Sequence, residues 1–199
     1  MIVGLIRHGL TDWNAKGKIQ GRSDIPLNEE GRQQARLLAE RLAAEPQKWD
    51  FVITSGLSRA QETGEIIASR LSIPVYDPDS RLLERSFGKA EGLTADERET
   101  LWGADWDTQA LGQETVEEVQ QRALSFMEDL AERFPDKNVL VVSHGGLLAQ
   151  LYRILYQDQY RERIGNLSLT VLEKKDKNWD LVLYNCTRHL ASPVSKNQE

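Results

Sequence analysis

The chain has 199 residues and a net charge of −6, with 40% hydrophobic and 28% charged residues. This length suits one compact domain, and the composition excludes disordered and fibrous proteins. The acidic balance argues against a general nucleic-acid binder, which needs a basic surface to replace counterions.

The chain contains one cysteine, Cys186, which cannot form an internal disulfide. This excludes a disulfide scaffold and a cysteine-rich zinc site, and it suits a reducing compartment. No segment approaches the ~18–20 apolar residues of a membrane span, and the N-terminus lacks a basic signal region. We therefore expect a cytoplasmic protein with neither nucleic acid nor membrane as a partner. The sequence leaves open whether it is a monomer or a homodimer.

Three short apolar runs predict buried strands at Ile2–Ile6, Phe51–Thr54 and Val139–Val142. Uninterrupted apolar runs of this length are typical of parallel strands covered on both faces. Helical periodicity fills the segments between them. We expect helices to begin near Asn28, Ser58, Thr94 and Thr115, and a central apolar helix to include Leu147–Leu155.

Capping-box spacing supports three of these helix starts. The pairs are Ser58 with Gln61, Thr94 with Glu97, and Thr115 with Glu118. Asn28 followed by two glutamates is a further N-terminal signal, and Pro135 is expected to end the helix that starts at Thr115.

The last quarter of the chain predicts a β-hairpin. Leu169–Glu173 and Leu181–Asn185 flank a charged loop at Lys174–Asp180. Alternating strands and helices followed by a hairpin predict an α/β domain with a mainly parallel, mixed sheet. We expect one domain at residues 1–190 and a polar tail at 191–199.

Polar residues follow all three predicted parallel strands. The groups are Arg7-His8-Gly9, Thr54-Ser55 with Arg59, and Ser143-His144-Gly145. Ligands of such sheets bind beyond the carboxyl ends of the strands. Each residue alone has an ordinary structural explanation, but neighbouring strands would bring two histidines and two arginines into one crevice.

These residue types suit a phosphate better than a metal. Arginines offer planar donor forks, while Gly9 and Gly145 would let backbone N–H groups approach an anion, Gly145 at a helix N-terminus. Nearby cations lower the pKa of a histidine, which favours the neutral, nucleophilic imidazole. Without carboxylates in the same segments, a metal site is disfavoured.

Phosphoryl transfer also needs an acid for the leaving oxygen. The segment Arg81–Gly92 offers Glu84 and Glu91, which spacing alone does not rank. An ion pair with a neighbouring arginine is the structural alternative for either glutamate.

Five ordered motifs resemble the histidine phosphatase superfamily, in the branch that contains the cofactor-dependent phosphoglycerate mutases. They are Arg7-His8-Gly9-x-Thr11-x-x-Asn14 with Gln20-Gly21, Pro26 to Ala35, Thr54 to Thr63, Leu83-Glu84 to Glu91-Gly92, and Val141 to Gly145 with the ending Asn185-x-x-x-His189-Leu190. The resemblance spans nearly the whole chain. It implies a three-layer α/β/α sandwich of the phosphoglycerate mutase type and a phosphatase without metal or cofactor, acting on a small phosphorylated substrate.

The resemblance also implies a role for each matched residue. His8 would become a phosphohistidine, and Arg7, Arg59 and His144 would hold the phosphoryl group. Glu84, rather than Glu91, would protonate the leaving oxygen and then deprotonate water. The residues implied in phosphate or substrate binding are Thr11, Asn14, Gln20, Gly21, Arg85 and Gly145, and His189 is expected to be structural.

Hydrolysis is favoured over the mutase reaction. Mutases carry a longer insertion with basic residues that encloses the substrate, whereas Thr100–Thr115 is short and contains no Lys or Arg. A mutase must keep water from its phosphoenzyme. Arg85 matches a mutase residue that contacts a carboxylate, but Phe87 and Gly146 replace a mutase Tyr and Asn. A third hypothesis, a non-catalytic phosphate-binding domain, is disfavoured because every catalytic position is occupied.

Overall fold

The computed structural model describes residues 1–191. The expected polar tail therefore lies, apart from its first residue, outside the described residues. Among the described helices, none combines the length and the apolar character that crossing a membrane requires.

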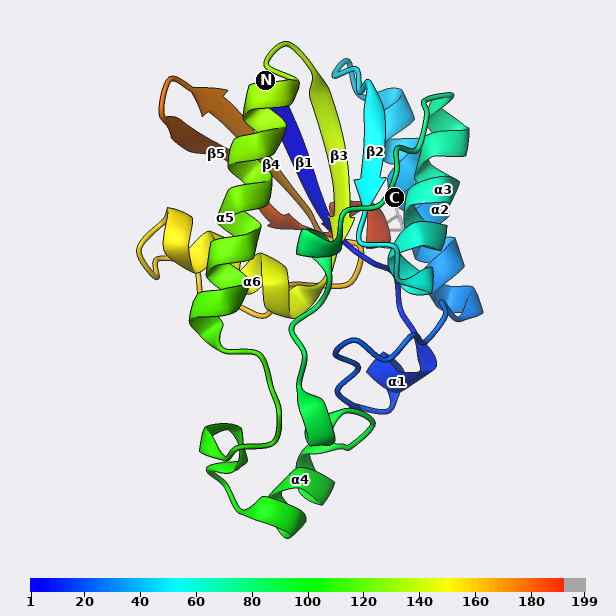
Figure 1. Cartoon of the computed structure of the whole chain (residues 1–199). Helices are drawn as coiled ribbons and strands as arrows, with labels where there is room; N and C mark the ends of the chain where they lie inside the picture. Colours follow the sequence, from blue (N-terminus) through cyan, green and yellow to red (C-terminus); the bar gives the residue numbers. More distant parts are fainter. Residues whose placement is uncertain (192–199) are drawn as a thin grey trace, which may run out of the picture.

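Five strands form one mixed sheet in the order β2-β3-β1-β4-β5 (Figure 1). Their bounds are β1 Ile2–Arg7, β2 Phe51–Thr54, β3 Asn138–Ser143, β4 Leu169–Lys175 and β5 Asn178–Cys186. β3 pairs in parallel with both β1 and β2, while β4 runs antiparallel to β1 and β5. The predicted parallel strands and the antiparallel addition are confirmed, and the three parallel strands are neighbours.

Helices cover both faces of the sheet, so the predicted three-layer α/β/α sandwich is confirmed. α2 (Glu29–Ala44) and α3 (Ser58–Leu71) lie on one side, and α5 (Val116–Arg133) and α6 (Gly145–Leu155) on the other (Figure 1). Each side encloses its own buried apolar cluster. Alternate residues of β3 serve the two clusters, with Val139 and Val141 on the α5–α6 side and Leu140 and Val142 on the α2–α3 side. This two-sided burial explains the uninterrupted apolar runs.

Two further segments lie beyond the carboxyl ends of the parallel strands. One contains the short helix α1 (Asp12–Ala15), and the other is a lobe of residues 88–115 that contains α4 (Ala95–Trp102). Single 3-10 turns occur at Ser80–Leu82, Gly88–Ala90, Trp106–Thr108 and Arg188–Leu190.

The helix caps agree with the sequence except at α3. Thr94 with Glu97 and Thr115 with Glu118 form reciprocal capping boxes, and Asn28 accepts a bond from the Gly31 N–H. α3 starts at Ser58, but its N-cap is Leu57, which has no side-chain cap. Its predicted capping box is wrong because both side chains have other partners: Ser58 Oγ donates to Asp24, and Gln61 accepts a bond from Thr54 Oγ1.

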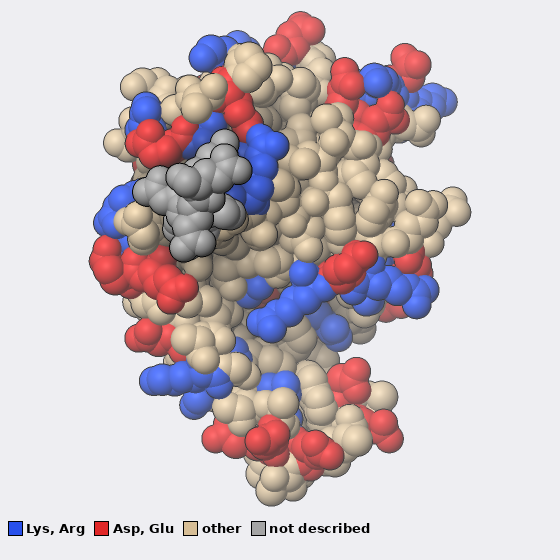
Figure 2. All heavy atoms as spheres, turned by 180° about the vertical axis from the view of Figure 1, so that it is seen from behind, with Lys and Arg blue, Asp and Glu red and all other residues tan. Residues whose placement is uncertain are grey.

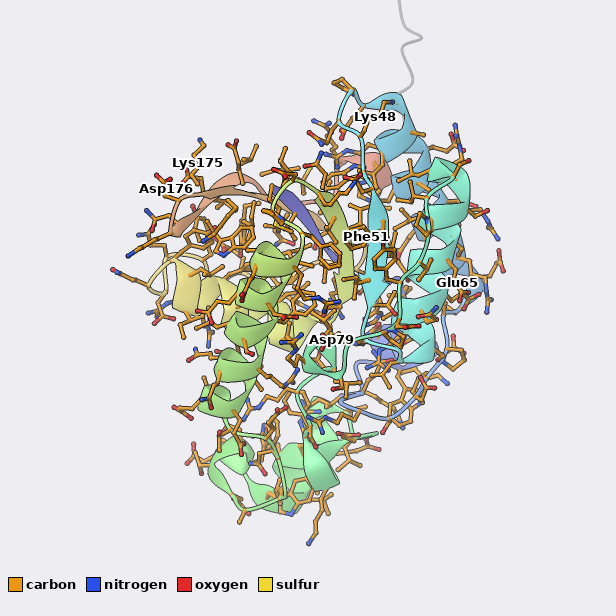
Figure 3. The ribbon with its side chains drawn as sticks, turned by 45° about the horizontal axis from the view of Figure 1, so that its top comes forward. Lys48, Phe51, Glu65, Asp79, Lys175 and Asp176 are labelled. Atoms are coloured by element: carbon orange, nitrogen blue, oxygen red, sulfur yellow. The ribbon has the colours of Figure 1, made fainter. Side chains whose placement is uncertain are left out.

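The hairpin is real, but its charged loop is shorter than predicted. β4 continues to Lys175 and β5 begins at Asn178, which leaves Asp176 in a left-handed turn conformation. Lys175 and Asp176 lie at the tip of the hairpin (Figure 3). Lys175 forms ion pairs with Glu173 and Asp180. The charged residues that the sequence pattern assigned to a loop therefore belong partly to the two strands, where they pair on a solvent-facing side.

Candidate active site

The parallel order of β1, β2 and β3 brings the three polar strand ends together. Arg7 is the register partner of Ser143, and the His8 N–H donates to the Ser143 carbonyl at 3.0 Å. As a result the rings of His8 and His144 lie with their centroids 5.2 Å apart. Both histidines are almost completely buried.

A cleft of about 440 Å³ opens at this edge of the sheet. Its volume lies within the ordinary range for small-molecule sites. The predicted site residues that line it are Arg7, His8, Asn14, Gln20, Gly21, Glu84 and Gly145.

The ring of His8 is fixed in one tautomer by its neighbour. Its Nδ1 lies 2.7 Å from the Gly9 carbonyl oxygen, which can only accept a hydrogen bond. Nδ1 of the neutral ring therefore carries the proton, and Nε2 keeps its lone pair. Burial, together with the charges of Arg7 and Arg59, lowers the pKa of His8 well below its ordinary value of 6.5. The neutral, nucleophilic form is therefore the one present at physiological pH.

His144 is held at its other nitrogen. Ser55 Oγ lies 2.7 Å from His144 Nε2 and also accepts the Leu57 N–H at 3.3 Å. His144 Nδ1 is buried and has no partner. Burial first, and then the charges of Arg59 and His8, lower the pKa of His144 well below 6.5. His144 is thus a second neutral imidazole, with one buried nitrogen that has no partner.

The two arginines are buried, and each leaves one of its hydrogen-bond donors without a partner. Arg7 donates to the Ile164 carbonyl, and Arg59 donates to the carbonyls of Ser23 and Gly21. The Nε groups of both arginines are buried without a partner. Burial lowers the pKa of Arg7 to about 10, which leaves it protonated at neutral pH. Buried donors without partners are costly, and an anion such as a phosphoryl group would satisfy them.

The structure places the two candidate acids differently. Glu84 lines the cleft, and its carboxylate receives the N–H groups of Gly146 and Leu147 at 3.0 Å each and of Arg85 at 2.8 Å. Glu91 is not a lining residue of the cleft. Its oxygens accept bonds from the backbone of Arg22, Ser23 and Phe87 and from the Ser23 hydroxyl. Of these two glutamates, only Glu84 lines the cleft.

Three residues with predicted ligand contacts are used differently. The Gly9 N–H donates to Thr63 Oγ1 at 3.1 Å, and a Cβ at Gly9 would lie 2.6 Å from the Gly31 carbonyl, so this glycine permits close packing on α2. The buried Thr11 hydroxyl caps α1 and donates to Gln20 Oε1. Arg85 donates to the Glu114 carbonyl and lies over the Phe87 ring, and neither it nor Thr11 is a lining residue of the cleft.

Part of the cleft comes from a segment that sequence reasoning missed. The run Arg161-Glu162-Arg163, between α6 and β4, lines the cleft. Lys18, which follows α1, lines it as well. Asn166, also between α6 and β4, donates to the His8 and Gly9 carbonyls and to Asn14. The available signal was an Arg-Glu-Arg run placed just before a predicted strand, but only the fold shows that this run faces His8.

Within residues 1–191, no group of three or more His, Cys, Asp or Glu side chains could hold a metal ion. His189, the third histidine, lies beside Arg41 rather than in the cleft, with its Nδ1 3.4 Å from the guanidinium.

Fold and sequence together define the class of protein. A sequence model of the histidine phosphatase superfamily (branch 1) matches residues 3–187, and the chain belongs to this family. It is 36% identical to an uncharacterized phosphatase, PhoE, of Bacillus subtilis (strain 168), over 95% of this chain and 96% of the relative.

Further comparisons agree on the fold and include two activities. The chain is 32% identical to a metal-independent phosphoserine phosphatase of Arabidopsis thaliana, over 94% of this chain and 82% of that one. It is 35% identical to a probable phosphoglycerate mutase, GpmB, of Enterobacter sp. (strain 638), over 89% and 86%. The solved structure of Bacillus stearothermophilus YhfR matches with a TM-score of 0.87 at 30% identity, covering 96% of this chain and 99% of that one.

Proposed function

We propose that this histidine phosphatase hydrolyses small phosphomonoesters through a phosphohistidine at His8. The proposal rests on one arrangement of side chains. His8 is a buried, neutral imidazole whose Nε2 keeps its lone pair, and Arg7, Arg59 and His144 around it have buried donors without partners. This combination offers a nucleophile to phosphorus and positive hydrogen-bond donors to the oxygens of the transferring group.

The first step forms the phosphoenzyme. His8 Nε2 attacks phosphorus, the bond from phosphorus to the leaving oxygen breaks, and that oxygen takes a proton from Glu84. Arg7 and Arg59 neutralise the charge of the three remaining phosphoryl oxygens. The Nδ1–H of His8 remains on the Gly9 carbonyl, which orients the ring for in-line attack.

The second step returns the enzyme to its starting state. Glu84, now a carboxylate, removes a proton from water, and the resulting hydroxide attacks phosphorus. The bond between phosphorus and Nε2 then breaks, which releases inorganic phosphate. The backbone N–H groups of Gly146, Leu147 and Arg85 hold the Glu84 carboxylate in place for this role.

The alternative activity is that of a phosphoglycerate mutase, a name that some relatives carry. Two features favour hydrolysis. The lobe of residues 88–115 places no basic side chain in the lining of the cleft. Arg85 donates to the Glu114 carbonyl and does not line the cleft. A mutase needs such groups to keep its intermediate bound and water excluded.

The test is a phosphorus NMR time course in the presence of EDTA. The protein is mixed with p-nitrophenyl phosphate, a sugar phosphate, a nucleotide and 3-phosphoglycerate. We expect inorganic phosphate to appear at a rate that chelator does not change. Growth of 2-phosphoglycerate instead, especially with added bisphosphoglycerate, would establish the mutase.

The His8→Ala variant separates catalysis from binding. We expect turnover to fall by at least about 10³-fold, as it does when a covalent nucleophile is lost, while vanadate or phosphate still binds. Turnover that survives this substitution would overturn the phosphohistidine route. Phosphate binding without any turnover by the unaltered protein would favour the non-catalytic domain.

A further inference from the structure

The catalytic cleft extends beyond the reacting groups onto a basic wall formed by Lys18, Arg161 and Arg163. Figure 2 shows basic side chains gathered where the surface is hollowed between the body of the molecule and the lobe of residues 88–115. Including Arg7, the cleft has four cationic side chains, against the two carboxylates of Glu84 and Glu162. The cleft therefore carries a local excess of positive charge, although the whole chain has a net charge of −6.

Two members of the basic wall have no acidic partner. Among the described residues, no carboxylate oxygen lies within 4 Å of Lys18 Nζ or of the Arg163 guanidinium, whereas Arg161 lies 3.9 Å from Asp158. Glu162, the acidic residue between the two arginines, accepts the Tyr184 hydroxyl at 3.1 Å. Arg163 is exposed and Lys18 is half-buried, with its Nζ 5.9 Å from the centroid of the Trp13 ring, and both residues line the cleft.

One of these unpaired charges, that of Arg163, acts on Arg7. The positive charge of Arg163 is one of the causes that lower the pKa of Arg7, after burial. Like charges facing one cleft repel each other until an anion enters. The transferring phosphoryl group already has Arg7, Arg59 and His144, so Lys18 and Arg163 remain for another group.

We propose that Lys18 and Arg163 bind a second anionic group, carried by the leaving group of the substrate. This inference rests on the proposed function and narrows it: the preferred substrates are phosphomonoesters that bear a carboxylate or a further phosphate on the part released as the alcohol. It also moves the recognition of an acidic substrate from Arg85, where the family resemblance placed it, to two residues that line the cleft.

The experiment compares three ligands with the same three-carbon chain. They are 3-hydroxypropyl phosphate, 3-phosphooxypropanoate and propane-1,3-diol bisphosphate, which end in a hydroxyl, a carboxylate and a second phosphate. We expect kcat/KM to be at least about tenfold higher for the acidic substrates, the ratio expected for one well-placed charge contact worth ~1.4 kcal/mol. The preference should shrink as salt is added.

Substitution assigns the preference to residues. Lys18→Gln and Arg163→Gln should each reduce the ratio of acidic to neutral substrate by about 3–10-fold, and the double variant should abolish it. Lys16→Gln removes the same charge from an exposed neighbour that does not line the cleft, and it should leave the ratio unchanged. A ratio that falls equally with Lys16→Gln would reflect only the general field and would overturn the proposal.

Binding to the His8→Ala protein makes the outcome independent of turnover. Calorimetry on this variant, with and without the Lys18 and Arg163 substitutions, compares the three Kd values directly. Acidic ligands that bind no more tightly than 3-hydroxypropyl phosphate would overturn the second anion site. A binding preference without hydrolysis by the unaltered protein would overturn the proposed function and leave this site standing. The two acidic ligands show whether carboxylate or phosphate is preferred.

Discussion

The two buried imidazoles of the site, His8 in the lining of the cleft and His144 beside it, are held at opposite nitrogens. His8 donates its Nδ1–H to Gly9, which leaves Nε2 free, whereas His144 is bound at Nε2 by Ser55 and leaves Nδ1 free. Ser55 Oγ already accepts the Leu57 N–H, and a donated hydroxyl hydrogen to Nε2 completes its bonding. Nδ1 of His144 then carries the ring proton. One histidine therefore presents a lone pair to phosphorus, and the other presents an N–H to a phosphoryl oxygen.

Replacing Ser55 by Ala should disturb catalysis through this tautomer. We expect kcat to fall about tenfold, because losing one buried hydrogen bond costs ~1–3 kcal/mol and 1.36 kcal/mol is a factor of ten. Nitrogen NMR of the His144 ring should show Nδ1 protonated in the native protein and a mixture of tautomers in the variant. Ser55→Thr keeps the hydroxyl and should retain the native tautomer. A loss of stability with an unchanged ring spectrum would reduce Ser55 to a structural role.

The acid function of Glu84 is tested by leaving groups of different quality. Glu84→Gln should slow alkyl phosphates at least about tenfold more than aryl phosphates, whose departure needs less protonation. Both Glu84 oxygens accept backbone N–H groups, so the amide of the variant would place its own NH₂ against one of them and slow both substrate classes. The ratio of the two losses is therefore the measurement that isolates the acid function. Glu91→Gln is the matched control and should affect both substrate classes alike. Equal losses in the Glu84 variant would shift the role of acid elsewhere.

At the scale of secondary-structure elements, the start of α6 organises the site. His144 is the N-cap of this helix, and the N–H groups of its second and third residues, Gly146 and Leu147, bind Glu84. A helix N-terminus stabilises negative charge, and here it holds a carboxylate in the cleft that His8 also lines. Gly146 makes room for it, since a Cβ there would lie 2.5 Å from Glu84 Oε1.

Gly146→Ala should therefore separate activity from stability. The new methyl meets the far end of a flexible side chain, so Glu84 moves while the helix, which favours Ala over Gly by ~1 kcal/mol, is not weakened. We expect an equal or higher melting temperature, with kcat for alkyl phosphates reduced about 10–100-fold because 1 Å of misplacement is costly. Full activity in this variant would show that Glu84 does not need its observed position.

Most elements followed from local patterns, whereas the errors occurred where distant segments meet. Apolar runs located every parallel strand, and capping residues located three helix starts, because burial on two faces and orphan N–H groups leave local signals. The role of Gly9 could not be predicted, since it depends on Gly31 of α2, 22 positions away. Arg85 was assigned to a ligand, but the Glu114 carbonyl competes for it. Lys18 and Arg163 line one cleft only after folding.

At the scale of the whole molecule, all three histidines of the chain are held neutral. Burial lowers the pKa of His8 and His144 well below 6.5, and burial together with Arg41 lowers that of His189 to about 4. In the unfolded chain each would titrate near 6.5. As the pH falls below that value, the histidines of the unfolded state bind protons whereas those of the folded state do not, so the free energy of unfolding decreases.

The consequence is a steep acid dependence of stability. The free energy of unfolding should be constant above pH 7.5 and should fall below pH 6.5, with a slope approaching ~4 kcal/mol per pH unit for three such groups. Urea denaturation at pH 7.5, 6.5, 5.5 and 5.0 measures it. His189→Gln should reduce the slope by about one third, and added phosphate should raise the midpoint because it binds only the folded state. A midpoint that stays level from pH 7.5 to 5.0 would contradict the buried neutral histidines.

The lobe of residues 88–115 is joined to the body by a narrow neck. The Glu114 N–H donates to the Ser86 carbonyl and the Lys89 N–H to the Leu111 carbonyl, so the chain leaves and re-enters the body at nearly the same point. The nucleophile, both arginines and Glu84 all lie outside the lobe. Glu91, Gly92 and Leu93 bind the loop of residues 19–23, which lines the cleft, whereas residues 94–110 form none of these bonds. Residues 94–110 can therefore be lengthened, shortened or exchanged without a change in the register of any strand. For protein engineering, the two ends of this inner segment are the natural splice points for transplanting a cover from one phosphatase to another while the catalytic groups stay in place.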